Sequence, residues 1–253
     1  MSVRHDVVDV RIGILTVGDE ILAGETTNTN ASWLAEQVTR RGATVRRILV
    51  VPDEPPVLEE TVARFHEAYD ATLLTGGLGG THDDVTVPAV AAALDCEVVV
   101  DGDALAAVEE TAREFADQNP ELVEKYELDL DTEAWASLPA GGRAIDNPVG
   151  LAPGCAVDGL YLLPGVPAEM RGVFGNVADE FGGDRVSRSL VSPAPEGALT
   201  ETLETARDEF DVAVGSYPSR EDRQVRVRVS APDGDRVDDA LDWLDERIET
   251  VDE

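Results

Sequence analysis

The chain has 253 residues, of which 43% are hydrophobic, so it can form one large domain or a main domain with a smaller one. Its 52 acidic and 20 basic residues give a formal net charge of −32, which excludes the basic surface that nucleic acid requires. The acids are spread along the whole chain, and Lys125 is its only lysine. This pattern indicates a solvated acidic shell adapted to a salt-rich cytoplasm, because the Debye length at about 1 M salt is only about 3 Å.

The N-terminus argues against a secreted or membrane-spanning protein, and the cysteines argue against a disulfide-rich or zinc-binding one. The first ten residues, "MSVRHDVVDV", lack the apolar core of a signal peptide, and no run of 18 apolar residues exists. We therefore expect a cytoplasmic protein with no membrane partner. Cys96 and Cys155 are too few and too far apart for a disulfide framework or a zinc site, so free thiols are expected.

The first part of the chain alternates short apolar runs with amphipathic segments. The predicted strands are "RIGILTV" (11–17), "TVRRILVV" (44–51) and "ATLLTGG" (71–77). The predicted helices cover 30–42, with Asn30 as its cap, 55–69, with prolines in its first turn, and 83–95. Strands and helices at this spacing form a mostly parallel sheet with helices on both faces. The predicted fold class is therefore a three-layer α/β/α domain.

The middle of the chain is less regular. Residues 104–118 predict a helix, and we expect another within 119–135 that carries Trp135. The stretches "GGRAIDN" (141–147) and "GCAVDGLYLLPG" (154–165) predict two strands. Residues 166–181 then predict a helix with Pro167 in its first turn.

The composition changes near residue 183, which predicts a domain over 1–182 and a small α+β module over 183–253. The module reads β-α-β-β-α, with a strand at 185–193, a helix at 196–210 and a strictly alternating strand at 224–230. Its last helix is predicted from one apolar stripe, formed by Val237, Leu241, Leu244, Ile248 and Val251.

The glycine-rich stretch "TGGLGGTHDDVT" (75–86) follows the third predicted strand. Its four glycines permit close approach, and the N–H groups of the next helix face an anion at the carboxyl edge of the sheet. Asp83 and Asp84 can hold a cation or a proton. The stretch is neither a Walker A motif nor a Rossmann fingerprint. The alternative is a tight turn in which both aspartates are first-turn helix residues.

Acidic pairs also follow the first two strands. Asp19 and Glu20 stand in the polar loop 16–30, and Asp53 and Glu54 end the second strand. Three acidic pairs at three successive strand ends predict a divalent metal site, because hard cations prefer oxygen ligands. A loop with helix caps remains the alternative for 16–30. Asn30 is at least as well explained by a cap as by a ligand contact.

Two rigid loops rich in glycine and proline complete the set of motifs. They are "NPVGLAPG" (147–154) and "LPGVPAEM" (163–170), each beside a predicted strand. Proline and glycine mostly mark turns. On physical grounds alone neither loop is assigned a function, and Glu169 is equally explained as a partner of the helix dipole.

In combination, these motifs resemble the molybdopterin-binding domain of MoaB and Mog proteins, and more narrowly the amino-terminal part of CinA proteins. The matching stretches are "GDEILAG", "TNASWLAE", "VPDE", the glycine loop, "NPVGLAPG" and "LPGVPAEM". The resemblance covers roughly residues 10–182, and the tail also fits the module that follows in CinA-type proteins. One departure is Gly80, which stands where the family usually has proline and would loosen the turn.

The resemblance implies a site that grips the phosphate of a pterin or nucleotide. By resemblance, Asp84 matches the acid that follows the glycine loop in the adenylating members, and Asp53 matches the acid after their preceding strand. Our leading hypothesis gives catalytic roles to Asp53, Asp83 and Asp84, with Asp83 and Asp84 as metal ligands. The implied ligand-binding residues are Gly18, Asp19, Glu20, Asn30, Thr75, Gly76, Gly77, Gly79, Gly80, Thr81, Pro164, Gly165 and Glu169.

The sequence leaves three functions open. The first is cleavage of a nucleotide pyrophosphate such as ADP-ribose or FAD with Mg²⁺ or Co²⁺. The second is ATP-dependent adenylation of molybdopterin in molybdenum cofactor biosynthesis. The third is a non-catalytic module that binds a nucleotide or pterin. Because family members assemble, we also expect a homo-oligomer, with a dimer as the first expectation.

Overall fold

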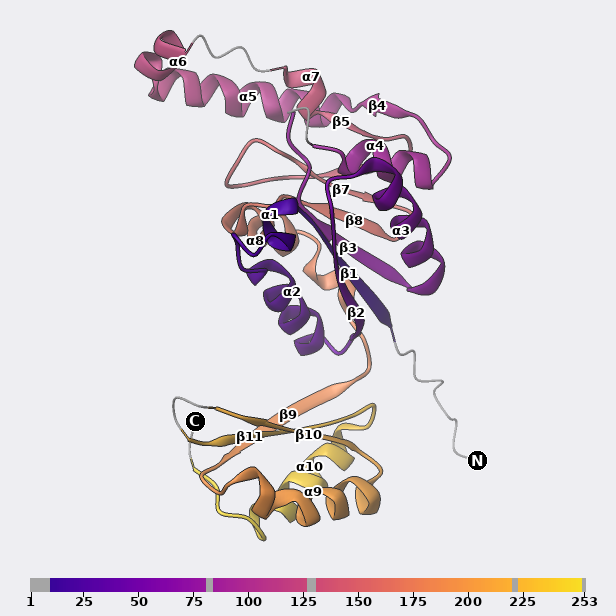
Figure 1. Cartoon of the computed structure of the whole chain (residues 1–253), viewed down its shortest axis with the longest axis vertical. Helices are drawn as coiled ribbons and strands as arrows, with labels where there is room; N and C mark the ends of the chain where they lie inside the picture. Colours follow the sequence, from indigo (N-terminus) through magenta and orange to yellow (C-terminus); the bar gives the residue numbers. More distant parts are fainter. Residues whose placement is uncertain (1–9, 81–83, 127–130, 220–222, 252–253) are drawn as a thin grey trace. The chain divides into compact units, whose positions relative to one another are not determined.

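A computed structural model describes residues 10–80, 84–126, 131–219 and 223–251 (Figure 1). By its contacts, the chain divides into two compact units. The larger comprises residues 10–37 and 45–181, and the smaller comprises residues 38–44 and the chain from Gly182 onward.

The larger unit is built on a six-stranded sheet in the order β2-β1-β3-β8-β7-β6. Its strands are β1 Arg11–Val17, β2 Thr44–Val51, β3 Ala71–Thr75, β6 Arg143–Ile145, β7 Gly154–Val157 and β8 Leu160–Leu163. β1, β3 and β8 are parallel neighbours, and β7 pairs antiparallel with both β8 and β6. The expected mostly parallel sheet is confirmed.

The strand predicted over 154–165 is wrong as a single element, because it forms the β7–β8 hairpin. The two strands are joined by Asp158 and Gly159, which have φ values of 44° and 77°. Positive φ at both central residues is the conformation of a type I′ turn, which Asp-Gly favours.

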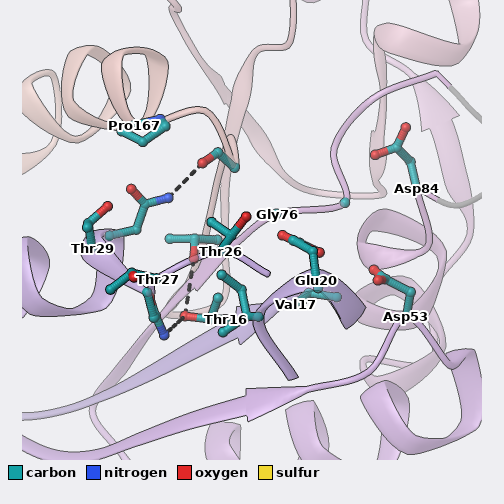
Figure 2. Close-up of a pocket in the computed structure, with 17 residues that line it drawn as sticks. Thr16, Val17, Glu20, Thr26, Thr27, Thr29, Asp53, Gly76, Asp84 and Pro167 are labelled. Atoms are coloured by element: carbon teal, nitrogen blue, oxygen red, sulfur yellow. Dashed lines mark hydrogen bonds between the residues drawn. The ribbon is translucent and has the colours of Figure 1, made fainter. Parts of the chain in front are cut away.

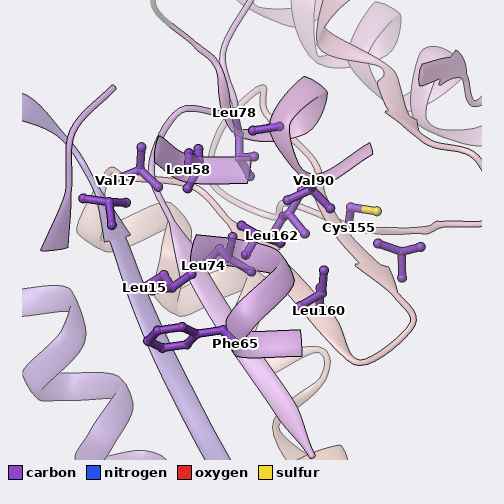
Figure 3. Close-up of a cluster of buried hydrophobic side chains, with 14 of the residues drawn as sticks. Leu15, Val17, Leu58, Phe65, Leu74, Leu78, Val90, Cys155, Leu160 and Leu162 are labelled. Atoms are coloured by element: carbon purple, nitrogen blue, oxygen red, sulfur yellow. The ribbon is translucent and has the colours of Figure 1, made fainter. Parts of the chain in front are cut away.

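Helices cover both faces of this sheet (Figure 1). α2 (Thr29–Arg40) and α8 (Pro167–Gly175) lie on one face, and α3 (Pro55–Ala68) and α4 (Thr86–Ala93) lie on the other. α3 begins with two prolines, as predicted, and turns Leu58, Val62 and Phe65 inward at helical spacing. These side chains pack with Leu15, Leu74 and Leu162 of the sheet and Val90 of α4 in one buried cluster (Figure 3). This cluster forms the core between the sheet and the helices α3 and α4.

The segment between α4 and β6 was only partly predicted. β4 (Val98–Val100) pairs antiparallel with β5 (Ser137–Pro139), and neither strand was expected. α5 (Gly102–Gln118) confirms the helix expected there. Two short helices, α6 (Pro120–Tyr126) and α7 (Thr132–Trp135), replace the single helix predicted within 119–135.

The C-terminal module has the predicted β-α-β-β-α order. Its elements are β9 Val186–Ser192, α9 Glu196–Phe210, β10 Ala213–Pro218, β11 Val225–Ala231 and α10 Gly234–Asp245. The antiparallel sheet β10-β11-β9 buries the alternate valines of β11 against both helices. α10 ends earlier than predicted, so Ile248 and Val251 lie beyond it, and Val251 forms a bridge with Val191.

Several predicted boundaries around the loops are wrong. A short helix, α1 (Asp19–Leu22), occupies the start of the stretch expected to be loop. α4 begins at Thr86 rather than at 83, so Asp84 precedes the helix. The helix expected over 166–181 ends at Gly175, and a separate 3-10 turn, η1, covers Ala178–Phe181. Among the described residues, no helix combines the length and apolarity needed to span a membrane.

Candidate functional site

The strand order places a reversal point between β1 and β3. The chain passes from β1 through α2 to β2 on one side of β1, and then through α3 to β3 on its other side. In sheets of this kind, ligands bind outside the carboxyl ends of the strands at such a point. A cavity of about 250 Å³ lies there, lined by residues that follow β1, β2, β3 and β8.

The cavity has two chemically distinct sides (Figure 2). The carboxylates of Glu20, Asp53 and Asp84 gather on one side, and threonine side chains lie on the other. The predicted residues that line the cavity are Gly18, Glu20, Asn30, Asp53, Thr75, Gly76, Gly77, Asp84 and Gly165. Asp19, Gly79, Gly80, Pro164 and Glu169 are not among the lining residues. Thr81 and Asp83 lie outside the described residues.

The first half of the glycine loop can be built only with glycine. Gly76 has φ +102°, and a Cβ there would lie 2.4 Å from the backbone oxygen of Val17. Gly77 has φ +65°, and its Cβ would lie 2.5 Å from Oγ1 of Thr86. Thr86 fixes both glycines, since its Oγ1 donates to the Gly76 carbonyl at 2.7 Å and its N–H donates to the Gly77 carbonyl at 3.2 Å.

The backbone N–H groups of the glycine loop, from Gly76 to Gly80, differ in whether they have a hydrogen-bond acceptor. The Gly76 N–H donates to the carbonyl of Leu163 at 3.1 Å. The N–H groups of residues 77–80 donate to no described residue, which leaves them to solvent or to a bound anion. The loop therefore supplies the backbone donors that the sequence predicted.

The first two acidic loops hold each other. The N–H of Asp19 donates to Oδ2 of Asp53 at 2.8 Å, and the N–H of Asp53 donates to Oδ1 of Asp19 at 3.4 Å. In addition, Gly18 N donates to the carbonyl of Val51. These bonds fix the carboxylate of Asp53 at the cavity and give Asp19 a supporting part.

The opposite side of the cavity holds Asn28, whose amide was expected from the sequence to offer a donor, and several residues that were not predicted. Nδ2 of Asn28 donates to Oγ1 of Thr16 at 3.0 Å, and Oγ1 of Thr75 lies 3.5 Å from the same atom. Oδ1 of Asn28 accepts from the N–H of Ala31, so Asn28 fills the capping role that was predicted for Asn30. Further missed lining residues are Val17, Ile21, Thr26, Thr27, Thr29 and Pro167. A polar Thr16 inside an apolar strand was the signal that could have found this side.

Asn30 lies just inside α2 and reaches across to another loop. Its Nδ2 donates to the carbonyl of Gly165 at 2.7 Å, which fixes the orientation of the amide. Oδ1 is buried and makes no hydrogen bond among the described residues. Asn30 therefore ties the start of α2 to the loop after β8.

Comparison with known proteins agrees with this architecture. Residues 13–182 match the model of a family described as a probable molybdopterin binding domain. The chain belongs to this family. Residues 184–251 match the middle domain of FAD synthase.

Within this molybdopterin-binding-domain family, individual relatives of the protein include CinA proteins. A protein of Archaeoglobus fulgidus is 33% identical over 93% of this chain and 96% of its own length. A CinA-like protein of Salinibacter ruber is 35% identical over 86% of this chain and 54% of its own, so the chain spans about half of that relative. The crystal structure of the protein CinA from Thermoplasma acidophilum is 33% identical, with a TM-score of 0.58, over 68% of this chain and 99% of the other. The chain is thus a CinA-like member of its family.

In this molybdopterin-binding domain, Glu169 joins the two rigid loops. Its Oε2 accepts from Nδ2 of Asn147 at 2.8 Å, and the same Nδ2 donates to the carbonyl of Ala152. Oδ1 of Asn147 accepts from the N–H groups of Val149 and Gly150. In this structure, Glu169 supports the loops rather than lining the cavity.

The carboxylates of the cavity are the described groups there that could contribute to a metal site. No three acidic, histidine or cysteine side chains of the described residues form a ready-made metal cluster. Mg²⁺ commonly uses one or two carboxylates together with substrate phosphates and water. Glu20, Asp53 and Asp84 are the described carboxylates that line the cavity and could serve in this way.

Proposed function

We propose that the protein is a metal-dependent hydrolase of a nucleotide pyrophosphate such as ADP-ribose or FAD. The observation that supports this proposal is the meeting of the backbone donors of the glycine loop and three carboxylates in one cavity at the reversal point of the sheet. The first group suits a phosphate, and the second suits a cation and a water molecule. The match of the tail to a FAD synthase domain adds support for a flavin or adenine nucleotide.

The phosphate is held by backbone rather than by basic side chains in this proposal. Among the described residues, no arginine or lysine lines the cavity. The N–H groups after Gly76 bind the phosphate oxygens, and the absent Cβ atoms allow the backbone to approach. Since the chain carries a net charge of −32, the pyrophosphate charge must be offset locally.

Asp53 and Asp84 would hold the divalent cation, with Asp83 as a further ligand from outside the described residues. The cation supplies positive charge to the phosphates and lowers the pKa of water. Asp84 orients the attacking water and accepts its proton. The water oxygen forms a bond to phosphorus, and the bridging P–O bond breaks. ADP-ribose then yields AMP and ribose 5-phosphate, and FAD yields AMP and FMN.

The test of this proposal is AMP release. The protein is incubated in high salt with ADP-ribose, FAD or ATP and with Mg²⁺ or Co²⁺, and the products are separated by chromatography. Asp84→Asn and Asp53→Asn remove one charge each while keeping the side-chain shape, and Asp53→Asn also keeps an acceptor for the Asp19 N–H. Asp158→Asn is the matched control, because Asp158 lies in the β7–β8 turn, at the end of β8 away from the cavity.

We expect AMP from the wild type and from Asp158→Asn, and a loss of about a hundredfold or more in the two cavity variants. Equal rates in all four proteins would refute a site at this cavity. If no AMP appears, the hydrolase assignment is wrong.

Adenylation of molybdopterin is the second candidate, because the family match over residues 13–182 contains the whole cavity. Here an oxygen of the pterin phosphate attacks the α-phosphorus of ATP and releases pyrophosphate. Incubation with ATP and molybdopterin together distinguishes this reaction from hydrolysis. Binding of either ligand without turnover would assign the protein as a non-catalytic module.

A further inference from the structure

The second half of the glycine loop contacts a tryptophan from a distant part of the chain. A Cβ added to Gly80 would lie 2.4 Å from Nε1 and 2.7 Å from Cδ1 of Trp135, so the pyrrole edge of the indole lies against Gly80. Unlike Gly76 and Gly77, Gly80 does not have a positive φ. The need for glycine at position 80 therefore comes from the indole and not from the backbone conformation.

The position of Trp135 is set by its own segment. Asp131 caps α7 by accepting from the N–H of Ala134 at 3.0 Å, and Trp135 ends that helix. The next residue, Ala136, is fully buried, and its carbonyl accepts from the N–H of Asp101 at 3.0 Å. The half-buried indole also packs against the main hydrophobic cluster. These contacts hold the indole in place beside Gly80 of the glycine loop.

A chain of contacts leads from this ring to the cavity. Gly80 is preceded in the loop by Gly79, where a Cβ would lie 2.2 Å from Oδ2 of Asp84. The carboxylate of Asp84 therefore packs on the backbone of Gly79 and lines the cavity, whereas Trp135 does not line it. Movement of Gly79 would change one of the surfaces against which the Asp84 carboxylate packs.

We propose that Trp135 is a positioning residue of this site. Its indole edge holds Gly79 and Gly80 in place, and these glycines set the position of the Asp84 carboxylate opposite the phosphate-binding half of the loop. The inference rests on the proposed function for the identity of the ligand, but the contact itself can be tested without any ligand.

The ligand-free test is residue-resolved hydrogen exchange on the full chain. The amides of Gly76 and Thr86 donate to Leu163 and Gly77, so they report on opening of the loop. In Trp135→Ala we expect both amides to exchange about tenfold faster. The amide of Gly18, which donates to Val51 in the neighbouring loop, should stay within about twofold and excludes general destabilisation.

A second variant tests the same contact from the other side. Gly80→Ala places a methyl group against the indole and should accelerate the same two amides, whereas Gly102→Ala has nothing within 4 Å and should not. In the Trp135→Ala background, Gly80→Ala should add less than about twofold, because the clash is gone. Unchanged exchange in Trp135→Ala, or an undiminished effect of Gly80→Ala in that background, would overturn the inference.

The functional readout separates the two proposals. With ADP-ribose as probe, Trp135→Ala should lower kcat about tenfold while KM changes by less than about twofold, and Trp135→Phe should recover part of the loss. Faster exchange with an unchanged kcat would overturn the positioning of Asp84. If the loop amides respond but the wild type releases no AMP, hydrolysis is wrong and the contact of Trp135 with the loop stands.

Discussion

Replacing Gly76 by alanine is the most direct test of how the glycine loop is built. The residue joins β3 to the loop and lies beside the end of β1. Its φ of +102° is a conformation that residues with a side chain rarely adopt. A methyl group there would also point at the carbonyl oxygen of Val17, the last residue of β1.

The cost of this substitution has two parts. A backbone conformation of this kind costs about 1–3 kcal/mol for a residue with a Cβ. The Cβ would lie 2.4 Å from the Val17 oxygen, whereas real Cβ atoms essentially never come closer than 3.0 Å, so the loop or the end of β1 must shift. Overpacking of this size costs about 1–3 kcal/mol. The expected loss in free energy of unfolding is therefore about 2–6 kcal/mol, or about 4–24 °C in Tm for a unit of this size.

Differential scanning calorimetry in high salt measures this loss. Gly102→Ala is the matched control, because Gly102 begins α5 and a Cβ there meets nothing within 4 Å. Alanine at that position should be neutral or stabilising by up to about 1 kcal/mol. If Gly76→Ala melts within about 1 °C of Gly102→Ala, neither the positive φ of Gly76 nor the Val17 carbonyl constrains the loop.

Three further predictions concern charge and titration. Burial raises the pKa of Cys155 to about 12, so iodoacetamide at neutral pH should label this thiol only after the protein unfolds. The partly exposed Cys96 should be labelled in the folded protein. Mass spectrometry of the peptides measures both reactions. Hydrogen bonds from Arg11 lower the pKa of Asp70 below 3.8, so the pair stabilises the fold above that pH and loses its effect as the pH falls through the lowered value. Asp70→Asn should therefore cost up to about 1 kcal/mol at neutral pH and nothing at strongly acidic pH, by denaturant titration at both. Finally, Tm should fall steeply as KCl is reduced from about 1 M to about 0.1 M, because the Debye length grows from about 3 to about 10 Å, and an equal Tm at both salts would contradict the halophilic interpretation of the charge.

The sequence predicted the parts of the site that follow from short-range rules. Apolar runs bounded by glycine or proline located β1, β2 and β3, and parallel strands bring their carboxyl ends to one edge. Strand order and edge alone are therefore enough to place Glu20, Asp53 and the glycine loop together. The same reasoning found the C-terminal module, because the valines of β11 alternate strictly.

The predictions fail where the role of a residue depends on contacts with distant parts of the chain, or where a local pattern fits two structures. Asn28 and Asn30 are equally good caps by type, and only the contact with Gly165 shows that Asn30 is used elsewhere. The Asp158-Gly159 pair favours a hairpin turn, but the apolar residues on both sides of it also fit one continuous strand. The contact of Trp135 with Gly80 joins segments far apart in the chain, and no local pattern reports it.

Several residues that line the cavity are exposed, whereas the central strands β1 and β3 beneath them are buried, and this separation affects how the ligand specificity of the protein can change. Thr26, Thr27 and Thr29 face the cavity and are exposed, whereas Ile14 and Leu73 in the sheet beneath are fully buried. Substitutions in the exposed threonines should alter which ligand fits while leaving the melting temperature nearly unchanged. The segment from residue 26 to residue 29 is therefore a natural place for libraries that redirect the protein to new ligands, and a route by which relatives with the same core can diverge in what they recognise.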